Sequence, residues 1–288
     1  MSPLFELVER PDLDSPVLVL ALDGWIDAGM GATGARSAIM EQLETVTVAT
    51  FDCDLLLDHR ARRPTMHLED GVMTGLSWPT IELRAASDTE GNDFLLLAGA
   101  EPDHTWRAFS RAAIDLAMEF GARLVVGLGA YPAPVPHTRP ARLAVSASEP
   151  TLAAIAPVHT TVDVPAGVQA AIEHRAHELG IPAVGLWAQV PHYVSAMPYP
   201  AASAALLEAL GSVASLHIDA LPLLEEAAST RRRLDALVAD NQDHTSMVGQ
   251  LETSYDADGE APTGTLGVGP LPSGDELAAE LEQFLRDQ

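Results

Sequence analysis

The stretch that decides the fold is Val17-Leu-Val-Leu-Ala-Leu22, which is followed by a glycine-rich segment from Gly24 to Gly34. Six apolar residues in a row, without alternation, are typical of a strand that is covered on both faces of a sheet. Apolar residues then recur at helical spacing between Ala35 and Glu44, and a β-branched run follows from Val46 to Phe51. This order of strand, helix and strand predicts a βαβ unit.

The alternation of strands and helices continues along the chain. Buried strands are expected at Phe94 to Ala98, Leu124 to Leu128 and Ala183 to Val190, and helices at Asp103 to Phe120 and Ala166 to Leu179. Residues Thr65 to Ala85 alternate around Asp70-Gly71, which predicts a hairpin inserted at a sheet edge. The pattern as a whole predicts an α/β fold, a three-layer α/β/α sandwich around a mostly parallel sheet.

Three parts of the chain differ in composition. Residues 1–215 carry the strands and form the expected α/β core domain, and residues 216–250 form a helical extension, with leucines at helical spacing from Leu221 to Asp240. Residues 251–288 are acidic and rich in Asp, Gly, Pro and Thr, which predicts a flexible tail with a short helix at Asp275 to Arg286. The basic block from Arg231 to Arg233 is either a solvated face or a contact for an acidic partner.

Composition places the chain among large globular domains. Its 288 residues are 47% hydrophobic and 20% charged, and no apolar run reaches the ~20 residues of a membrane helix. The first 14 residues carry Glu6, Glu9 and Asp12 where a signal peptide needs basic residues, so we expect a cytoplasmic protein. The single cysteine, Cys53, excludes an internal disulfide and gives no zinc-binding pattern.

The charge of the chain excludes several classes of function. A formal net charge of −25 repels nucleic-acid phosphates and anionic lipids, so we expect neither nucleic acid nor membrane as a partner. The basic residues are all arginine, because the chain contains no lysine. This excludes a P-loop lysine, a pyridoxal phosphate Schiff base and a lysine clamp on ATP. We therefore expect no cofactor, and the lone cysteine at no metal-ligand spacing leads us to expect no metal.

Three glycines in the first turn match a nucleotide-binding pattern. Gly29, Gly31 and Gly34 spell G-x-G-x-x-G before a helix, and Asp52 ends the next strand where a ribose-binding acid stands in that pattern. However, the segment from Asp23 to Ala28 separates the strand from the first glycine and brings two carboxylates toward the pyrophosphate position. The alternative is that the glycines allow a tight turn and close helix packing, and the sequence favours this alternative.

Polar residues follow the other strands at the edge where open α/β sheets bind ligands. The loop Pro136 to Pro140 holds His137, Thr138 and Arg139, which together suit the binding of an anion. The alternative is that Arg139 pairs with Asp23 or Asp27 and fixes one loop against another. Either arrangement brings the loops together.

Two more segments add to this rim, Glu101 to Trp106 and Pro191 to Tyr193. Candidate acid/base residues are His137, His192 and Asp27. Candidate ligand or partner-binding residues are Asp23, Gly24, Trp25, Asp27, Glu101, Asp103, Thr138, Arg139 and Tyr193. The chain has no G-x-S-x-G or H-E-x-x-H motif, so the sequence identifies no nucleophile and no metal site.

At these residues the sequence resembles the proteasome assembly chaperone 2 family, in its bacterial branch. The resemblance covers most of residues 15–250. It rests on four segments, Gly24-Trp-Ile-Asp-Ala-Gly29, Gly99-Ala-Glu-Pro102 to Trp106, Pro136-His-Thr-Arg-Pro140 and Val190-Pro-His-Tyr193. It implies a phosphorylase/hydrolase-like α/β/α core with a mixed sheet and a homo-oligomer, for which the family suggests a trimer. Bacterial members mostly lack an assigned activity, and the eukaryotic namesake escorts proteasome subunits.

Two classes of function stay open from the sequence. The first is a non-catalytic binding or assembly scaffold that self-associates and holds a protein partner, and the missing catalytic motifs favour it. The second is a hydrolase or transferase acting on a small anionic or nucleoside-like substrate, with Arg139 binding the anion and His137 or His192 as acid/base. Some family members are labelled ATP-grasp ligases, and the absence of lysine argues against that chemistry here.

Overall fold

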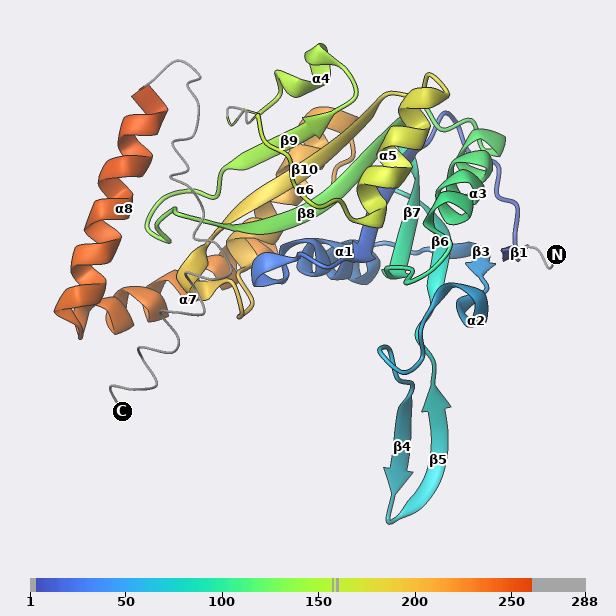
Figure 1. Ribbon diagram of the computed structural model, residues 1–288, viewed down its shortest axis with the longest axis horizontal. Helices are drawn as coiled ribbons and strands as arrows, with labels where there is room; N and C mark the ends of the chain where they lie inside the picture. Colours follow the sequence, from blue (N-terminus) through green and yellow to red (C-terminus); the bar gives the residue numbers. More distant parts are fainter. Residues whose placement is uncertain (1–3, 157, 159–160, 261–288) are drawn as a thin grey trace.

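A mixed sheet of eight strands forms the centre of the molecule in the computed structural model, which describes residues 4–156, 158 and 161–260 (Figure 1). The strands are, in spatial order, β1 (Phe5–Leu7), β3 (Val46–Phe51), β6 (Ile81–Ser87), β7 (Asp93–Ala100), β2 (Val17–Asp23), β8 (Leu124–Ala133), β10 (Ala183–Pro191) and β9 (Leu143–Ala147). The central strands β7, β2, β8 and β10 run parallel, and the strands outside them pair antiparallel. This confirms the prediction of a mostly parallel, mixed sheet.

Strand β2 supplies side chains to both cores of the molecule. Every residue from Val17 to Leu22 is buried, as the continuous apolar run predicts. Because successive side chains of a strand point to opposite faces, β2 contributes Val17, Val19 and Ala21 to one core and Leu18, Leu20 and Leu22 to the other. Full burial of one such Val or Leu side chain is worth roughly 1.5–3 kcal/mol of hydrophobic free energy.

Helices cover both faces of the sheet, which makes three layers. Helices α1 (Gly31–Gln42) and α6 (Pro200–Ala214) lie on one face, and α3 (Trp106–Glu119) and α5 (Val168–Glu178) lie on the other (Figure 1). The predicted α/β/α sandwich is therefore confirmed. The sequence did not indicate α6, because most of its alanines and leucines are buried and leave no polar stripe to mark a helical period.

The two strands of the first βαβ unit, β2 and β3, are not neighbours in the sheet. Strands β2 and β3 point in the same direction, as a βαβ crossover requires, but β6 and β7 lie between them in the sheet. Strand β6 belongs to the stretch that we expected to form the inserted hairpin. Its residues Ile81, Leu83 and Ala85 are buried in the main sheet, and a period of two does not distinguish such a strand from a hairpin arm.

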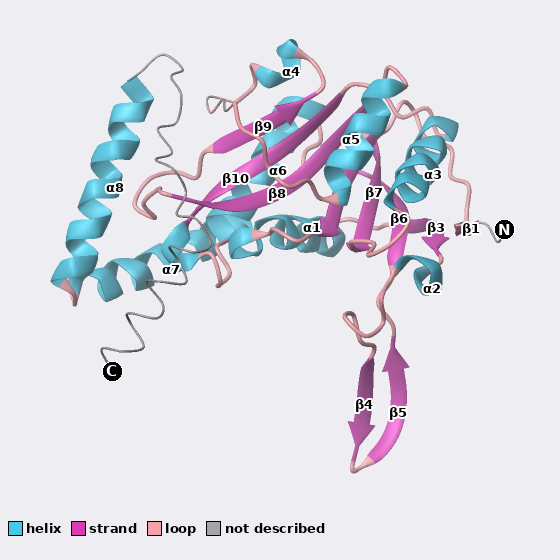
Figure 2. Ribbon diagram, viewed as in Figure 1, coloured by secondary structure: helices cyan, strands magenta, loops and turns pink. Residues whose placement is uncertain are grey.

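The inserted hairpin is formed by β4 (Thr65–Glu69) and β5 (Val72–Ser77), which pair only with each other among the described strands. Its turn residues Asp70 and Gly71 have φ values of 49° and 81°, the left-handed conformation that an Asp-Gly two-residue turn supplies. Figure 2 shows the two strands projecting away from the layers of the sandwich.

The helical extension consists of α7 (Leu221–Ala239) and α8 (Gln242–Glu260), which stands beside the end of the sheet (Figure 1). We expected the extension to end at residue 250, but α8 continues through residues 251–260, which the sequence placed in the acidic tail. Contacts with the core hold this last part, as described below. The rest of the expected tail and the short helix expected at Asp275 to Arg286 lie outside the described residues.

The remaining elements are short and belong to the connections. They are α2 (Cys53–Leu56), α4 (Pro150–Ala153) and two 3-10 turns, η1 (Ala28–Met30) and η2 (His192–Val194). Of the helices that the structure describes, none has an apolar stretch of the length that spanning a bilayer requires.

Candidate functional site

The candidate residues stand at the end of β2 and in the loops that follow β2, β7, β8 and β10, and the structure divides them into two groups. The first group, after β2 and β7, contains Asp23, Gly24, Trp25, Asp27, Glu101 and Asp103. The second group, after β8 and β10, contains His137, Thr138, Arg139, His192 and Tyr193. Among the described residues, no hydrogen bond or ion pair joins a side chain of one group to a side chain of the other.

Asp27 stabilises the start of α1. Its two carboxylate oxygens accept hydrogen bonds from the backbone N–H groups of Ala32 at 2.8 Å and Thr33 at 3.0 Å. These amides are free donors in the first helical turn, and they are the donors that a dinucleotide pyrophosphate would need. The carboxylate therefore occupies the phosphate position of the nucleotide-binding pattern. Asp52 likewise caps α2, through the amides of Asp54 and Leu55, and is not placed to bind a ribose.

The three glycines of that pattern serve close packing. A Cβ at Gly29, whose φ is 62°, would lie 2.7 Å from Tyr199 Cβ, and one at Gly31 would lie 2.7 Å from Ala130 Cβ. A Cβ at Gly34 would overlap the side chain of Ser203 on α6. The glycines thus let α1 approach the sheet and α6, as the structural alternative for this segment predicts.

The other acids of the first group also bond within the chain. Asp23 pairs with Arg36 at 2.7 Å, and a Glu101 oxygen accepts from the backbone N–H of Val168, at 2.7 Å, at the start of α5. Asp103 accepts from the backbone N–H of Asp58 at 2.8 Å and pairs with Arg62 at 3.3 Å, which fixes the segment leading into the hairpin.

Gly24 and Trp25, the two residues that follow β2, have different surroundings. Gly24 makes a tight turn in which its N–H donates to the carbonyl of Leu22 at 2.9 Å. Trp25 is 59% exposed, and one edge of its ring lies beside Gly167 at the start of α5. Trp25 is therefore the one large apolar side chain of the first group that faces solvent.

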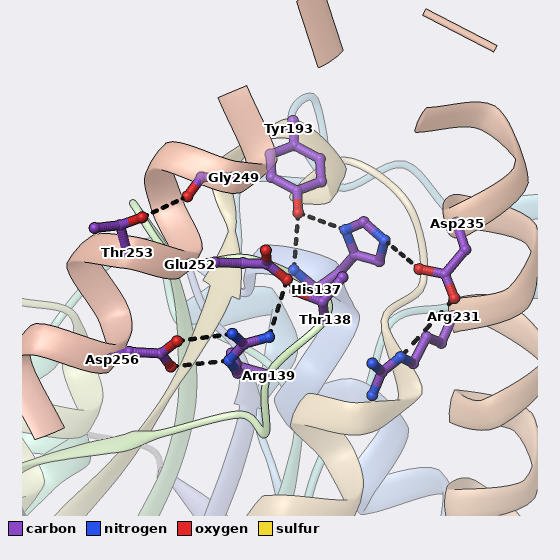
Figure 3. A network of polar contacts seen from close by, with 10 residues as sticks. All are labelled: His137, Thr138, Arg139, Tyr193, Arg231, Asp235, Gly249, Glu252, Thr253 and Asp256. Atoms are coloured by element: carbon purple, nitrogen blue, oxygen red, sulfur yellow. Dashed lines mark hydrogen bonds and ion pairs between the residues drawn. The ribbon is translucent and has the colours of Figure 1, made fainter. Parts of the chain in front are cut away.

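In the second group, His137 is buried between two partners from different elements (Figure 3). Its Nδ1 lies 2.6 Å from the hydroxyl of Tyr193, and its Nε2 lies 3.2 Å from a carboxylate oxygen of Asp235 on α7. The backbone N–H of His137 donates to the same hydroxyl at 2.8 Å. Tyr193 therefore donates its proton to Nδ1, and Nε2–H donates to Asp235. Burial lowers the pKa of His137, although Asp235 opposes this, and thus favours the neutral ring.

Arg139 clamps helix α8 to the loop after β8 (Figure 3). Its guanidinium donates to both oxygens of Asp256, at 2.9 and 2.7 Å, and to Glu252 at 2.9 Å. The hydroxyl of Thr138 donates to the same Glu252 oxygen. The bidentate bond from Arg139 lowers the pKa of Asp256, and that bond raises the pKa of Arg139. The pairing of Arg139 with Asp23 or Asp27, which was one of two alternatives, was wrong.

A second arginine strengthens the same contact. Arg142 lies over the ring of Tyr255, with its guanidinium carbon 3.4 Å from the ring centroid, and donates to the carbonyl of Tyr255 at 2.7 Å. The hydroxyl of Tyr255 donates to the carbonyl of Pro140 at 2.9 Å. Sequence reasoning missed these partners because residues 251–260 lack hydrophobic periodicity. Their available signal was the spacing of Glu252, Tyr255 and Asp256, which places them on one side of a helix.

His192 and the block from Arg231 to Arg233 are exposed and make fewer contacts within the chain than His137 and Arg139. The ring of His192 is exposed and meets Tyr193 edge-on, with 5.3 Å between the ring centroids. Within the block from Arg231 to Arg233, Arg231 lies 4.0 Å from Asp235 and Arg233 bonds to Thr230, while all three residues are exposed. This agrees with a solvated helix face.

One pocket of the molecule lies away from the rim. A pocket of about 550 Å³ lies at the opposite edge of the sheet, lined by the end of α6, the segment from Leu216 to Asp219 and Thr89. Within the described part of the chain, no three His, Cys, Asp or Glu side chains are grouped to hold a metal ion. The candidate site is therefore a set of polar contacts that join loops and helices.

Comparison with known proteins decides the family. A model of the PAC2 family matches residues 21–238 of the chain, from β2 to α7. The chain belongs to the PAC2 family. The match includes both groups of rim residues and Asp235, whereas the α8 residues that hold Arg139 lie beyond it. The family resemblance seen in the sequence is confirmed.

Solved structures of several other proteins are similar to this chain over most of their length. A protein of unknown function from Corynebacterium glutamicum ATCC 13032 is 32% identical, with a TM-score of 0.85, covering 89% of this chain and 98% of that one. A Mycobacterium tuberculosis protein of unknown function is 36% identical, with a TM-score of 0.84, covering 89% and 92%. A Mycobacterium tuberculosis proteasome-assembly chaperone homologue is 29% identical, with a TM-score of 0.75, covering 81% and 99%. A comparison with curated proteins gave no match.

Proposed function

We propose that this PAC2-family chain is a non-catalytic binding or assembly scaffold that holds a protein partner. One observation carries the proposal: the polar side chains at the rim are already used in bonds within the chain. Asp27 and Glu101 stabilise helix starts, and Arg139 is held by two carboxylates of α8. These bonds fix loops and helices in place, and they leave few of these polar side chains free for catalysis.

The alternative of a hydrolase or transferase has less support. Binding of a small anion by Arg139 would require the anion to displace both Asp256 and Glu252. His137 is only 3% exposed and both of its ring nitrogens are bonded, while the exposed His192 has no carboxylate within bonding distance among the described residues. Acid/base catalysis needs an accessible group in reach of substrate, and neither histidine supplies one with an orienting partner.

The class of partner that we propose is taken from the name of one similar protein. The Mycobacterium tuberculosis structure at 29% identity is called a proteasome-assembly chaperone homologue. We extend this to the present chain as a proposal and name a subunit of a multi-subunit assembly, with the proteasome first, as the partner. A cytoplasmic location and a homo-oligomer, with the trimer that the family suggests, belong to the same proposal.

The test is affinity capture of the tagged protein from a lysate of its source, with bound proteins quantified by mass spectrometry. Wild type is compared with Arg139→Ala, which releases the clamp on α8, and with Arg232→Ala, which removes an equal charge from an exposed site on α7. We expect a stoichiometric protein partner with wild type and with Arg232→Ala. Loss of the partner in Arg139→Ala alone would assign the contact to the clamped end of the molecule.

Recovery of nothing beyond the protein itself would contradict a protein partner. The small-molecule alternative would then be tested by adding phosphate or nucleosides to the purified protein and measuring its melting temperature. A rise that Arg139→Ala abolishes would favour the enzyme and overturn the scaffold.

A further inference from the structure

Most of the arginines that lack a bonding partner among the described residues lie at one place on the molecule. The other arginines hold a carboxylate, a carbonyl or a hydroxyl, as Arg139 holds Asp256 and Glu252. Those with no side-chain hydrogen bond or ion pair to another described residue are Arg60, Arg63, Arg107, Arg111 and Arg232. Each of them is exposed. Arg232 lies alone on α7, and the others, here called the arginine surface, lie around the start of α3.

Hydrogen bonds join the two segments that carry the arginine surface, which are the loop between α2 and β4 and the first turns of α3. The backbone N–H groups of Asp103 and His104, just before α3, donate to the carbonyl of Leu56 at 2.8 and 3.0 Å. The guanidinium of Arg62, which is adjacent to Arg63 in the loop, pairs with Asp103 at 3.3 Å. The loop is therefore fixed against the entrance of α3.

The carboxylates beside the arginine surface are already bonded to other groups. Asp103 holds Arg62 and also accepts from the backbone N–H of Asp58 at 2.8 Å. The side chain of Asp58 accepts from a backbone N–H of its own loop at 2.9 Å, and Asp54 lies 2.8 Å from His59 Nε2. The positive charge of the arginine surface is therefore left unpaired, in a chain whose formal net charge is −25.

The two arginines on α3 are spaced by one helical turn. Arg107 and Arg111 are four residues apart, so their side chains lie on the same side of the helix. Asp115, a further four residues along, forms no ion pair with Arg111 in the described part of the chain. Because a guanidinium binds a carboxylate through two parallel hydrogen bonds, two arginines at this spacing match two carboxylates about 6 Å apart, the distance between side chains one turn apart on a helix.

An exposed aromatic ring lies near the segment that leads from β7 into α3. A Cβ at Gly167 would lie 3.0 Å from a carboxylate oxygen of Glu101 and 3.3 Å from the ring of Trp25, so the ring lies beside that segment. Trp25 is 59% exposed. Tryptophan and arginine are the residues that most often carry the binding energy of protein interfaces. The surroundings of the arginine surface therefore suit contact with a protein better than contact with a free anion.

We propose that the arginine surface binds an acidic segment of a protein partner, in which carboxylates stand one helical turn apart. Charge complementarity identifies this occupant, because the unpaired arginines attract carboxylates and fix their position. The net charge of −25 disfavours nucleic acid and anionic membranes, which the rest of the chain repels. The proposal deepens the proposed function and rests on it, since the acidic segment belongs to the protein partner. It places the contact at the start of α3.

The test measures the binding of a fluorescein-labelled peptide to the full chain by fluorescence anisotropy. The peptide is a helix-forming alanine peptide with glutamates four residues apart, and the same peptide with glutamine in place of glutamate is its neutral counterpart. We expect saturable binding of the acidic peptide in the micromolar range at low salt and none of the neutral peptide. Added salt should weaken the binding, because it screens exposed charges.

Arg107→Ala and Arg111→Ala are compared with Arg232→Ala, which removes an exposed arginine without a bonding partner from α7. None of these side chains bonds to another described residue, so the variants should fold as wild type does, which circular dichroism checks. Arg107→Ala and Arg111→Ala should each weaken peptide binding about threefold, and the double variant about tenfold. Arg232→Ala should bind the peptide as wild type does.

Several outcomes of the peptide measurement would overturn the proposal. Equal affinities for the double variant and Arg232→Ala would do so, as would equal binding of the acidic and neutral peptides. Competition by a DNA duplex of the same charge would overturn the assignment to a protein segment. Sedimentation that shows the mass doubling with concentration in wild type, but not in the double variant, would assign the surface to a second copy instead.

Capture from the lysate separates this proposal from the proposed function. We expect the double variant of Arg107 and Arg111 to lose the partner that wild type and Arg232→Ala retain. A partner retained equally by wild type and the double variant would overturn the arginine surface and leave the proposed function standing. Recovery of nothing by wild type would overturn both.

Discussion

Two polar clusters lie along strands β8, β9 and β10, and they differ in how their charges are balanced. At the carboxyl ends of β8 and β10, Arg139 meets two carboxylates of α8. Beneath α5, the carboxylate of Glu173 meets only neutral groups, the Gln169 amide at 2.9 Å and the Ser146 hydroxyl at 3.3 Å. Burial raises the pKa of Glu173 to about 7, whereas the bond from Arg139 lowers the pKa of Asp256. The Arg139 cluster, which is the one that most resembles an active site, is therefore the one in which opposite charges already balance each other.

The Glu173 cluster occupies space that two glycines leave in the sheet. A Cβ at Gly185 would lie 2.8 Å from the Glu173 carboxylate, and a Cβ at Gly127 would overlap it. Trp187 donates to the hydroxyl of Ser146 at 3.1 Å and closes the cluster on its outer side. A buried carboxylate without an opposite charge lowers stability when it ionises, so this cluster makes the protein sensitive to pH.

The largest effect on stability is expected from the removal of His137, whose buried ring bonds to Asp235 on α7. His137→Ala leaves a cavity and leaves Tyr193 and Asp235 without their ring nitrogens, which should lower the free energy of unfolding by roughly 2–4 kcal/mol. Urea denaturation followed by circular dichroism measures this change.

The matched control for this variant is His192→Ala. Its ring is exposed and touches the same tyrosine, so it should change the free energy of unfolding by less than about 0.5 kcal/mol. If His137→Ala unfolds at the wild-type midpoint, the buried ring does not hold α7.

Glu173→Gln should stabilise the protein above pH 7. The pKa of Glu173 is raised from about 4.5 in the unfolded chain to about 7 in the folded one, so the folded state holds the proton more tightly. Stability from this group is complete below pH 4.5 and is lost as the pH rises through 7. The glutamine keeps a neutral side chain of the same shape, and we expect a gain on the order of 2 kcal/mol at pH 8 and about none at pH 4.5.

Thermal unfolding of both proteins at several pH values tests this dependence. Glu225→Gln, which removes a carboxylate from the exposed face of α7, serves as the control and should give a small difference that does not vary between pH 5 and 8. A constant difference for Glu173→Gln across the same range would show that the buried carboxylate is compensated by charge after all.

The central part of the fold follows from the sequence because its signals are strong and local. A continuous apolar run such as Val17 to Leu22 has few structures available besides a strand covered on both faces. The Asp70-Gly71 turn requires left-handed backbone, which those two residues supply. In contrast, edge strands β1 and β9 have three and five residues, too few for a period to be recognised.

The candidate site was predicted only in part. The sequence named the residues that meet at the loops, and His137 and Tyr193 do meet. The remaining partners of His137 and Arg139 come from α7 and α8, about 100 residues further along the chain, and no local pattern indicates such contacts. In the glycine-rich turn, Gly29, Gly31 and Gly34 match a nucleotide-binding pattern, but the sequence favoured close packing for them, and close packing is what they serve.

The smallest change in global stability is expected from Arg139→Ala, because its bonds hold a peripheral helix and both partners are partly exposed. The variant should leave the main urea transition near that of wild type and accelerate amide hydrogen exchange within α8, while β2 and β8 keep their protection. Added salt should act on wild type in the same direction, since it screens the two ion pairs. Arg232→Ala removes a charge from α7 without touching this clamp, so exchange in α8 should stay at the wild-type rate. Equal exchange in α8 for all three proteins would mean that the apolar contact of Val248, which is 5% exposed, holds the helix by itself.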